Sequence, residues 1–296
     1  MIKFLLSLIA LNLLLFSCTQ PTENPFATNA TAELIIDGFS FTEGPTSDSE
    51  GNIYFTDQPN NLIYKYSTEA VLDTFSNESS RSNGLYIDQN ENLWACADMY
   101  NQLWKYDLNG NKEVVLNPEG KVVFNGPNDV WVHTNGNVYF TDPYYKRPYW
   151  EGVHDTLVYQ GVYLLRKGQI APVLLDSTLV QPNGIVGISS DNFLYVADIG
   201  DDKTYRYSIL ADGTLAEKEL LIEQGSDGMT LDSEGNIYLT GKGVDVFDSS
   251  GKAIRHLDIP EDWTANICFG GKDNNELFIT ASKGLYGLKT NVKGVK

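Results

Sequence analysis

The chain of 296 residues has few of the side chains on which several common kinds of site depend. It contains three histidines that lie far apart in the sequence, His133, His154 and His256, so a zinc site of imidazole and thiolate ligands is not indicated. Of its three cysteines, Cys96 and Cys268 fall inside apolar stretches, which favours inert buried thiols over a disulfide. No Ser-His-Asp or Cys-His arrangement is visible, so nothing points to a hydrolase with an activated nucleophile.

Basic residues are outnumbered, with 21 Lys and Arg against 39 Asp and Glu, and the net charge is −18. The chain therefore lacks a basic surface for nucleic acid, and nucleic acid is not an expected partner. A field of this sign repels anions and gathers cations.

A long apolar run occurs only near the start of the chain, where Lys3 precedes a mostly apolar stretch ending at Ser17 and Cys18. The stretch is too short to span a bilayer comfortably and is typical of an export signal. A small residue followed by cysteine resembles a bacterial lipobox, so residues 1–18 are predicted to be a lipoprotein signal with Cys18 as the lipidated residue. The alternatives are an ordinary secretory signal with an incidental cysteine and, less favoured, a buried core helix.

Residues 19–31 are polar and contain proline, which is the composition of a disordered tether. Such a tether would hold a folded domain off a membrane surface. We therefore expect a protein lipid-anchored in the bacterial cell envelope, either in the periplasm or facing outward from the outer membrane. Loss of Lys3 with the leader would change the net charge from −18 to −19.

The remaining sequence, residues 32–296, repeats one pattern. Its clearest copy runs from Phe124 to Asp142 and holds a polar turn, a short strand, an Asn-Gly turn and a second strand. Five other segments resemble it, and the apolar residue that opens the second strand recurs every 40 to 56 residues, at Ile53, Leu93, Val138, Leu194, Ile237 and Leu277. Units of four short strands at this spacing predict an all-β, six-bladed β-propeller in one domain. The repeat count disfavours a β-sandwich.

Strands within each repeat alternate in direction, so the start of the first strand and the end of the second share one face of the disc. In the second repeat the strands are expected at residues 84–88, 93–97, 102–107 and 112–116. The first strand of a propeller blade is innermost, and the residue at its head is expected to point at the central channel. Counting back from each anchor gives six such residues: Glu43, Asn83, Asn128, Asn183, Asp227 and Asn266.

All six residues of this predicted ring carry a carboxylate or a carboxamide. An Asn before Gly is an ordinary turn former, so turn chemistry explains most of these positions taken singly. The set favours a shared function, because Glu43 and Asp227 would repel each other in a channel of low dielectric and would need a cation. Oxygen ligands with two negative charges suit Ca²⁺, Mg²⁺ or Mn²⁺.

Several motifs resemble, in order and spacing, those of the regucalcin/gluconolactonase (SMP-30/gluconolactonase/LRE-like) family of six-bladed propellers: residues 43–45 (EGP), 125–129 (NGPND), 140–143 (FTDP), 181–184 (QPNG), 226–229 (SDGM) and 268–271 (CFGG). The likeness covers essentially the whole chain after the tether. It implies a divalent cation on the propeller axis, Ca²⁺ in preference to Zn²⁺, Mn²⁺ or Mg²⁺, held by Glu43, Asn128, Asn183 and Asp227. Asn83 and Asn266 remain as candidates for contact with the substrate.

The sequence departs from the family pattern at Gly126. Regucalcin-like lactonases carry an Arg at this position, two residues before the ligand Asn, and that Arg contacts the substrate. Arg81 has the same offset before Asn83 and is a candidate replacement across the ring, with a surface arginine in a polar turn as the alternative. The resemblance therefore leaves the substrate open.

The third repeat carries an insertion, residues 144–160, where the other repeats have a few residues. It follows the second strand and is therefore expected on the same face as the acidic ring. Five aromatic residues together with Lys146, Arg147 and His154 favour a lid over a sugar-like or anionic substrate, with Tyr144 and Arg147 as its substrate contacts. The alternative is a loop that packs on its own blade or covers an edge of the disc.

The implied reaction is hydrolysis of a lactone or related ester by water, with the cation polarising the carbonyl group. Asp227 is the first candidate for the general base and Glu43 the second, because they are the only acids in the ring. Aspartates also end several second strands, and their recurrence favours a role in turns: Asp57, Asp98, Asp142 and Asp198.

Two other interpretations stay open. The propeller could be a non-catalytic, calcium-dependent binding or sensor module in which the ring is a structural metal site, or the same ring could serve phosphotriester hydrolysis. In the favoured interpretation the protein is a monomer that acts on a small lactone or ester and meets the membrane only through its lipid.

Overall fold

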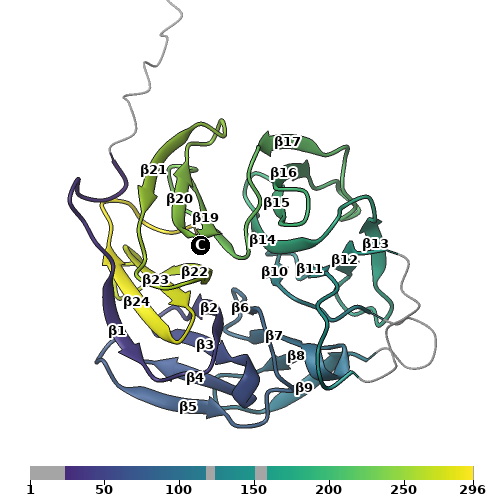
Figure 1. The fold of residues 1–296 in the computed structure, drawn as a ribbon. Helices are drawn as coiled ribbons and strands as arrows, with labels where there is room; N and C mark the ends of the chain where they lie inside the picture. Colours follow the sequence, from purple (N-terminus) through teal and green to yellow (C-terminus); the bar gives the residue numbers. More distant parts are fainter. Residues whose placement is uncertain (1–23, 118–123, 151–158, 296) are drawn as a thin grey trace, which may run out of the picture.

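The computed structural model describes residues 24–117, 124–150 and 159–295. In these residues 24 strands form six four-stranded antiparallel sheets, which are arranged around a common axis (Figure 1). The predicted six-bladed propeller is confirmed. The predicted signal segment, including Cys18, lies outside the described residues.

The first three blades follow one another along the chain. Blade 1 consists of β2 (Thr42–Ser47), β3 (Ile53–Asp57), β4 (Leu62–Tyr66) and β5 (Leu72–Ser76). Blade 2 consists of β6 (Leu85–Ile87), β7 (Leu93–Ala97), β8 (Gln102–Tyr106) and β9 (Lys112–Leu116). Blade 3 consists of β10 (Val130–Val132), β11 (Val138–Asp142), β12 (Gly161–Leu165) and β13 (Val173–Asp176). The expected strands of the second repeat agree with blade 2 to within one residue at each end.

The other three blades complete the ring. Blade 4 consists of β14 (Pro182–Ile188), β15 (Phe193–Asp198), β16 (Lys203–Ser208) and β17 (Glu219–Ile222). Blade 5 consists of β18 (Met229–Leu231), β19 (Ile237–Gly241), β20 (Gly243–Phe247) and β21 (Ala253–Leu257). Blade 6 consists of β22 (Thr264–Gly270), β23 (Glu276–Ala281), β24 (Gly284–Lys289) and the N-terminal strand β1 (Glu33–Asp37).

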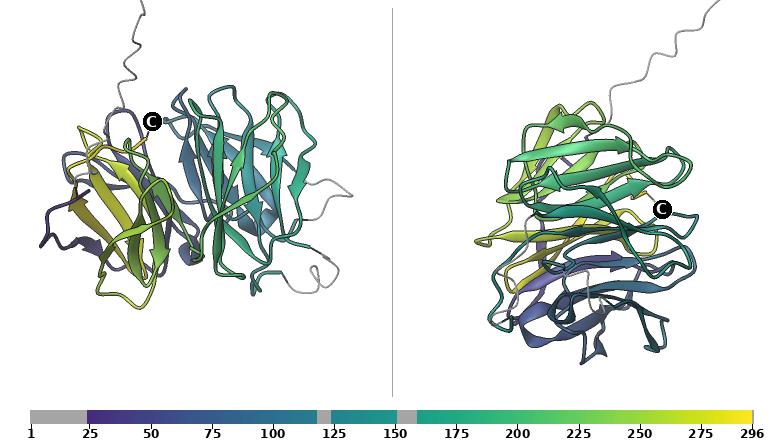
Figure 2. Two further views of the ribbon diagram at one scale, coloured as in Figure 1. Left: turned by 90° about the horizontal axis from the view of Figure 1, so that it is seen from above. Right: turned by 90° about the vertical axis from the view of Figure 1, so that its right-hand side faces the viewer.

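The pairing of β1 with β24 closes the ring, because the first strand of the chain supplies the outer strand of the last blade. Figure 2 shows the same blades from two further sides, with the purple N-terminal strand lying against the yellow C-terminal blade. Closure of this kind ties the two ends of the chain together, and the short inner edges of the blades are protected within the ring.

Burial decreases from the axis outward. Every residue of β3, β7 and β11 is buried, and each of these strands is the second of its blade. The outer strands alternate or are largely exposed, as in β9 and β21. The apolar side chains of neighbouring blades face each other in continuous clusters, so each blade depends on its neighbours for burial.

The turn between the first and second strands uses the same device in three blades. Asp48 accepts hydrogen bonds from the Asn52 backbone N–H (2.8 Å) and side chain (2.8 Å), and from the Tyr54 hydroxyl (3.3 Å). Asp88 and Asp232 make equivalent bonds to the Asn and the aromatic residue four and six positions later. The repeated Asp-x-x-x-Asn spacing is therefore a turn motif on the face of the disc where these hairpins lie.

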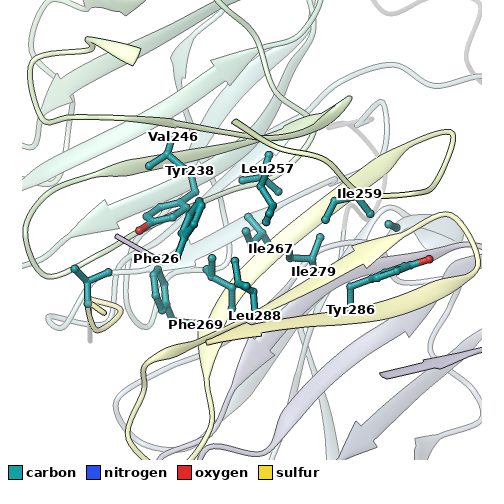
Figure 3. Close-up of a cluster of buried hydrophobic side chains, with 14 residues drawn as sticks. Phe26, Tyr238, Val246, Leu257, Ile259, Ile267, Phe269, Ile279, Tyr286 and Leu288 are labelled. Carbon is teal, nitrogen blue, oxygen red and sulfur yellow. The ribbon is translucent and has the colours of Figure 1, made fainter. Parts of the chain in front are cut away.

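Residues 24–31 pack against the propeller, which differs from the tether predicted for residues 19–31. Phe26 is fully buried in a cluster that includes Tyr238 and Phe269, as the close-up in Figure 3 shows. The Asn291 backbone N–H donates to the Pro25 carbonyl oxygen (2.8 Å), and the Arg255 guanidinium lies 4.9 Å from the centre of the Phe26 ring. The folded body therefore begins before the predicted boundary at residue 32.

Cys96 and Cys268 are both buried and free, as the sequence predicts. Within the described ranges no helix is long and apolar enough to cross a membrane.

Candidate active site

The six residues of the predicted ring lie at the heads of the innermost strands. Three of them belong to the strands β2, β14 and β22, and three stand two positions before β6, β10 and β18. The strand register shifts beside Glu43, Asn183 and Asn266. Such bulges re-aim a side chain that regular alternation would direct elsewhere.

Three buried threonines from second strands hold these heads in place. The hydroxyl groups of Thr56, Thr141 and Thr240 each donate to a backbone carbonyl oxygen of the following blade. The acceptors are, in order, Asn83 (3.0 Å), Asn183 (2.7 Å) and Ala265 (2.9 Å). The ring is thus fixed by contacts between blades as well as within them.

A pocket of about 470 Å³ opens at this end of the central channel. Four ring residues line it: Glu43, Asn83, Asn128 and Asp227. The other described residues of its wall are Phe41, Gln58, Pro59, Tyr145, Arg147, Gln181, Ile199 and Trp263. A single pocket of a size that suits a small molecule therefore holds both acids of the ring.

Asp227 is held by hydrogen bonds to both of its carboxylate oxygens. The Asn183 carboxamide donates to Oδ1 (2.6 Å) and the Trp263 indole donates to Oδ2 (2.6 Å). Burial raises the pKa of Asp227 to about 6, and these two hydrogen bonds limit the rise because they favour the charged form. Asn183 also donates to the Tyr145 hydroxyl (2.8 Å), so its carboxamide nitrogen is fully engaged.

Glu43 is 5% exposed, and its Oε2 accepts a hydrogen bond from the Gly44 backbone N–H (3.0 Å). Burial and the nearby Asp227 carboxylate raise the pKa of Glu43 well above its ordinary value. Two carboxyl groups in one buried site disfavour each other's ionisation unless a positive charge compensates them.

The carboxamides suit a divalent cation as well. The Asn83 Oδ1 is buried and has no hydrogen-bond partner among the described residues. A buried acceptor without a partner is costly, and a cation or a substrate hydroxyl in this pocket would satisfy it. Carboxylate and carboxamide oxygens are the ligands that Ca²⁺ prefers, so the residues present fit the group that the sequence predicts.

The described part of the chain contains no group of three or more His, Cys, Asp or Glu side chains placed to hold a metal ion. The ring contributes two such acids, Glu43 and Asp227, and its other members are carboxamides. A cation in this pocket would therefore depend on neutral oxygen ligands for part of its coordination.

Comparison with known proteins establishes the family to which the chain belongs. The model of the family described as SMP-30/Gluconolactonase/LRE-like region matches residues 41–283. The chain belongs to this family. It is 28% identical over 295 residues to a gluconolactonase of Zymomonas mobilis, in an alignment that covers 88% of this chain and 82% of that protein.

Two solved structures extend this SMP-30/gluconolactonase assignment. One is described as a candidate gluconolactonase and has a TM-score of 0.84 at 28% identity, covering 92% of this chain and 96% of its own. The other is a calcium-binding regucalcin of Agrobacterium tumefaciens, with a TM-score of 0.75 at 19% identity and coverage of 90% and 95%, which is a likeness of fold.

Three strand-end aspartates of this family member act in turns, as predicted. Asp57 accepts backbone N–H groups of Ser40 (3.1 Å) and Phe41 (3.2 Å), and Asp142 and Asp198 accept the equivalent N–H groups in blades 3 and 4. Each therefore closes the loop that enters its own blade.

Asp98 differs from the other strand-end aspartates. Its Oδ2 accepts hydrogen bonds from Gln58 (2.9 Å) and the Tyr149 hydroxyl (2.7 Å), and it forms an ion pair with the Arg147 Nε (2.9 Å). Burial raises the pKa of Asp98, and the Arg147 charge opposes the rise. Asp98 therefore connects blade 1 and the insertion of blade 3 to the rim of the pocket.

Arg81, Tyr144 and Asn266 are not among the described residues that line the pocket. The Arg81 guanidinium donates to the Pro59 carbonyl oxygen (2.7 Å) and lies 5.1 Å from the centre of the Tyr149 ring, so it supports the rim from outside. Tyr144 is 39% exposed. Of the five predicted substrate contacts, Asn83 and Arg147 lie in the pocket wall.

Asn266 lines a second cavity, of about 370 Å³, at the other end of the channel. Asp129, whose pKa burial raises to about 7, also lines this cavity. The Asn266 Oδ1 accepts the Ile267 backbone N–H (2.8 Å), so this oxygen is already used within the chain. The sixth ring position therefore faces away from the pocket that holds the acids.

Sequence reasoning missed Trp263, Tyr145 and Gln58, which all line the pocket. Trp263 belongs to the loop that enters blade 6, three residues before the ring position, and only its contact with Asp227 distinguishes it. Tyr145 was within the predicted lid, but the choice between neighbouring tyrosines depends on which one faces the ring.

Proposed function

We propose that this protein is a metal-dependent hydrolase of a lactone or a closely related ester. The observation that carries the proposal is the pocket in which Glu43 and Asp227 lie together with Asn83 and Asn128. Membership of the SMP-30/gluconolactonase family and the likeness to the gluconolactonase of Zymomonas mobilis support it.

Glu43, Asn128, Asn183 and Asp227 would hold the cation, for which Ca²⁺ is favoured and Zn²⁺, Mn²⁺ and Mg²⁺ are alternatives. A bound divalent cation would polarise the lactone carbonyl and stabilise negative charge that develops on its oxygen. The regucalcin of similar fold is described as calcium-binding, which supports the choice of Ca²⁺.

Asp227 would act as the general base, with Glu43 as the second candidate. A water molecule attacks the carbonyl carbon and gives a proton to the carboxylate, and the ring C–O bond breaks as that proton passes to the departing alkoxide oxygen. The product is the hydroxy acid. Burial raises the pKa of Asp227 to about 6 in the cation-free site, and a bound cation would lower it, so Asp227 would be charged and able to accept a proton at neutral pH.

The test is hydrolysis of a panel of lactones by the purified full chain, followed as acid release in a weakly buffered solution. Activity should require a divalent cation, disappear with a chelator and return when Ca²⁺ is added. Asp227→Asn should lose at least about 100-fold in kcat, since it removes the base but keeps the shape. Binding of Ca²⁺ by this variant, measured by calorimetry, separates loss of the base from loss of the ion.

Two results would overturn the proposal. Cation binding without turnover of any lactone would favour a calcium-dependent binding protein, for which the calcium-binding regucalcin is the specific support. Turnover of phosphotriesters in preference to lactones would favour a phosphotriester hydrolase that uses the same ring.

A further inference from the structure

The insertion of blade 3 brings an arginine into the pocket wall at a place that the strand framework does not supply. Arg147 lines the pocket, and its guanidinium lies 5.3 Å from the centre of the Tyr145 ring, which lines it as well. The charge of Arg147 opposes the rise in the pKa of both Glu43 and Asp227, so it lies close enough to act on the two acids.

A clamp centred on Asp98 fixes this arginine by an ion pair, and Asp98 itself is held by two hydrogen bonds. The Arg147 Nε, the Tyr149 hydroxyl and the Gln58 carboxamide all lie within 2.9 Å of a single oxygen, Asp98 Oδ2. Asp98 is 2% exposed. Because the Arg147 Nε faces Asp98 in this ion pair, the two terminal amino groups of the guanidinium are the donors placed for a ligand.

Gly126 is what makes room for the clamp. A Cβ atom at this position would lie 2.3 Å from the Trp150 ring carbon Cη2 and 2.4 Å from Asp98 Oδ1. Any side chain at position 126 would therefore collide with the insertion and with the aspartate that holds Arg147. An arginine at position 126 and the clamped Arg147 exclude each other.

We propose that Arg147 is the specificity-determining residue of this pocket and binds oxygen atoms of the substrate that lie away from the reacting carbonyl. Asp98 is its positioning residue. This inference rests on the proposed function and names the substrate class: a lactone whose ring or side chain carries several hydroxyl groups, or a carboxylate. The planar guanidinium suits paired oxygen acceptors of this kind.

The experiment compares three lactones with the full chain in saturating Ca²⁺. Gluconolactone presents hydroxyl groups, glucarolactone adds a terminal carboxylate, and δ-valerolactone presents neither. Arg147→Gln should raise KM for the first two by about 10-fold or more, with kcat changed by less than about 3-fold, and should leave δ-valerolactone unaffected. The larger effect among the first two identifies whether hydroxyl or carboxylate oxygens are bound.

The companion variants report on position and charge. Asp98→Asn should raise KM for the hydroxylated lactones by a smaller factor, and Arg147→Lys should restore only part of the lost affinity because a lysine lacks the planar fork. Arg206→Gln is the matched control, since Arg206 is also ion-paired (to Glu219, 2.8 Å) and lies over an aromatic ring, but is outside the pocket. Arg206→Gln should leave KM and kcat for all three lactones unchanged.

An equal change for all three lactones, or a fall confined to kcat, would overturn the role of Arg147 while leaving the proposed hydrolase intact. If the unchanged protein hydrolyses no lactone, the proposed function fails, and calorimetry with gluconate and glucarate then tests Arg147 by itself. Weaker binding of these acids by Arg147→Gln but not by Arg206→Gln would support the inference, and equal binding would overturn it.

Discussion

Carboxylates and carboxamides of nearly equal shape occupy equivalent positions of the ring, and their difference in charge determines what each can do. Asn128 and Asn183 add oxygen ligands without adding charge. Glu43 and Asp227 add two negative charges to a site where burial disfavours them. A ring of six acids would be too unstable without a cation, and a ring of six amides would bind one weakly.

The first prediction concerns pH and the cation. Burial raises the pKa of Asp227 to about 6, so below that pH protons compete with a cation for the site. We expect Ca²⁺ at 100 times its Kd to add about 2.7 kcal/mol to the free energy of unfolding at about pH 7.5 and much less at about pH 5. Thermal melting with and without Ca²⁺ at the two pH values measures this.

Without a cation, the contribution of Asp227 to stability changes with pH in the opposite direction. The folded protein holds a proton on Asp227 up to about pH 6, whereas the ordinary value is 3.8, so it binds more protons than the unfolded chain between these values. Rising pH through this window therefore lowers the stability contributed by Asp227. A Ca²⁺ effect of equal size at both pH values would contradict the proposed ligands.

The second prediction concerns Trp263, whose indole N–H donates to Asp227 Oδ2 (2.6 Å). This bond favours the charged carboxylate, so Trp263→Phe should raise the pKa of Asp227. The acidic limb of the profile of kcat/KM against pH should then move to higher pH, while the alkaline limb stays in place. An unmoved acidic limb would exclude Asp227 as the base. Trp94→Phe serves as the control, because the Trp94 indole donates to Asp88 (2.9 Å) outside the pocket wall.

At the level of residues, the sequence was sufficient to find four ring residues that line the pocket but not the clamp. The ring recurs at one position of every repeat, so counting from the apolar anchors finds it. Asp98 also recurs, and its recurrence favoured a turn. Its partners Arg147 and Tyr149 come from an insertion with no counterpart in other repeats, and no period could reveal their contact.

At the scale of elements, a short segment near the N-terminus packs against the propeller more firmly than its composition indicates. Half of residues 24–31 are polar, and the single large apolar residue among them, Phe26, is fully buried. Composition averages over the segment and misses one anchoring side chain. The strands, in contrast, were predictable because their alternation and turns repeat six times.

The third prediction tests this segment. Phe26→Ala removes a ring that packs with Tyr238 and Phe269, and we expect it to lower the free energy of unfolding by about 3 kcal/mol, the cost of truncating a core phenylalanine. Urea denaturation of the full chain measures the change. Ile170→Ala, at a side chain that is 85% exposed, should shift it by less than about 0.5 kcal/mol. A near-zero effect of Phe26→Ala would mean that the segment is only a tether.

On the scale of the whole molecule, the two ends of the channel have different surroundings. The pocket with Glu43 and Asp227 opens at one end, and Val295 near the C-terminus lines the cavity at the other end. Asn291, four residues earlier, binds the Asn24 and Pro25 carbonyl oxygens (3.0 and 2.8 Å). The described N-terminal residues therefore join the body near the end that is remote from the acids.

The fourth prediction follows from this arrangement. We propose that Cys18 carries a lipid and holds the protein at the bacterial cell envelope. Because the body includes Asn24, the six steps of chain from Cys18 to Asn24 would span at most about 22 Å between the lipid and the propeller. A body held so closely, by its end remote from Asp227, would keep the pocket open to solvent and to substrate.

Cys18→Ser should abolish incorporation of labelled palmitate and move the protein from the membrane fraction to the soluble fraction of the producing bacterium. Its kcat/KM on a soluble lactone should equal that of the anchored protein, because the pocket lies at the far end of the channel. Cys96→Ser is the matched control, since Cys96 is buried in β7 and should not affect the label. Persistent labelling of Cys18→Ser would exclude the anchor, and a large change in kcat/KM on release would mean that the membrane restricts access to the pocket.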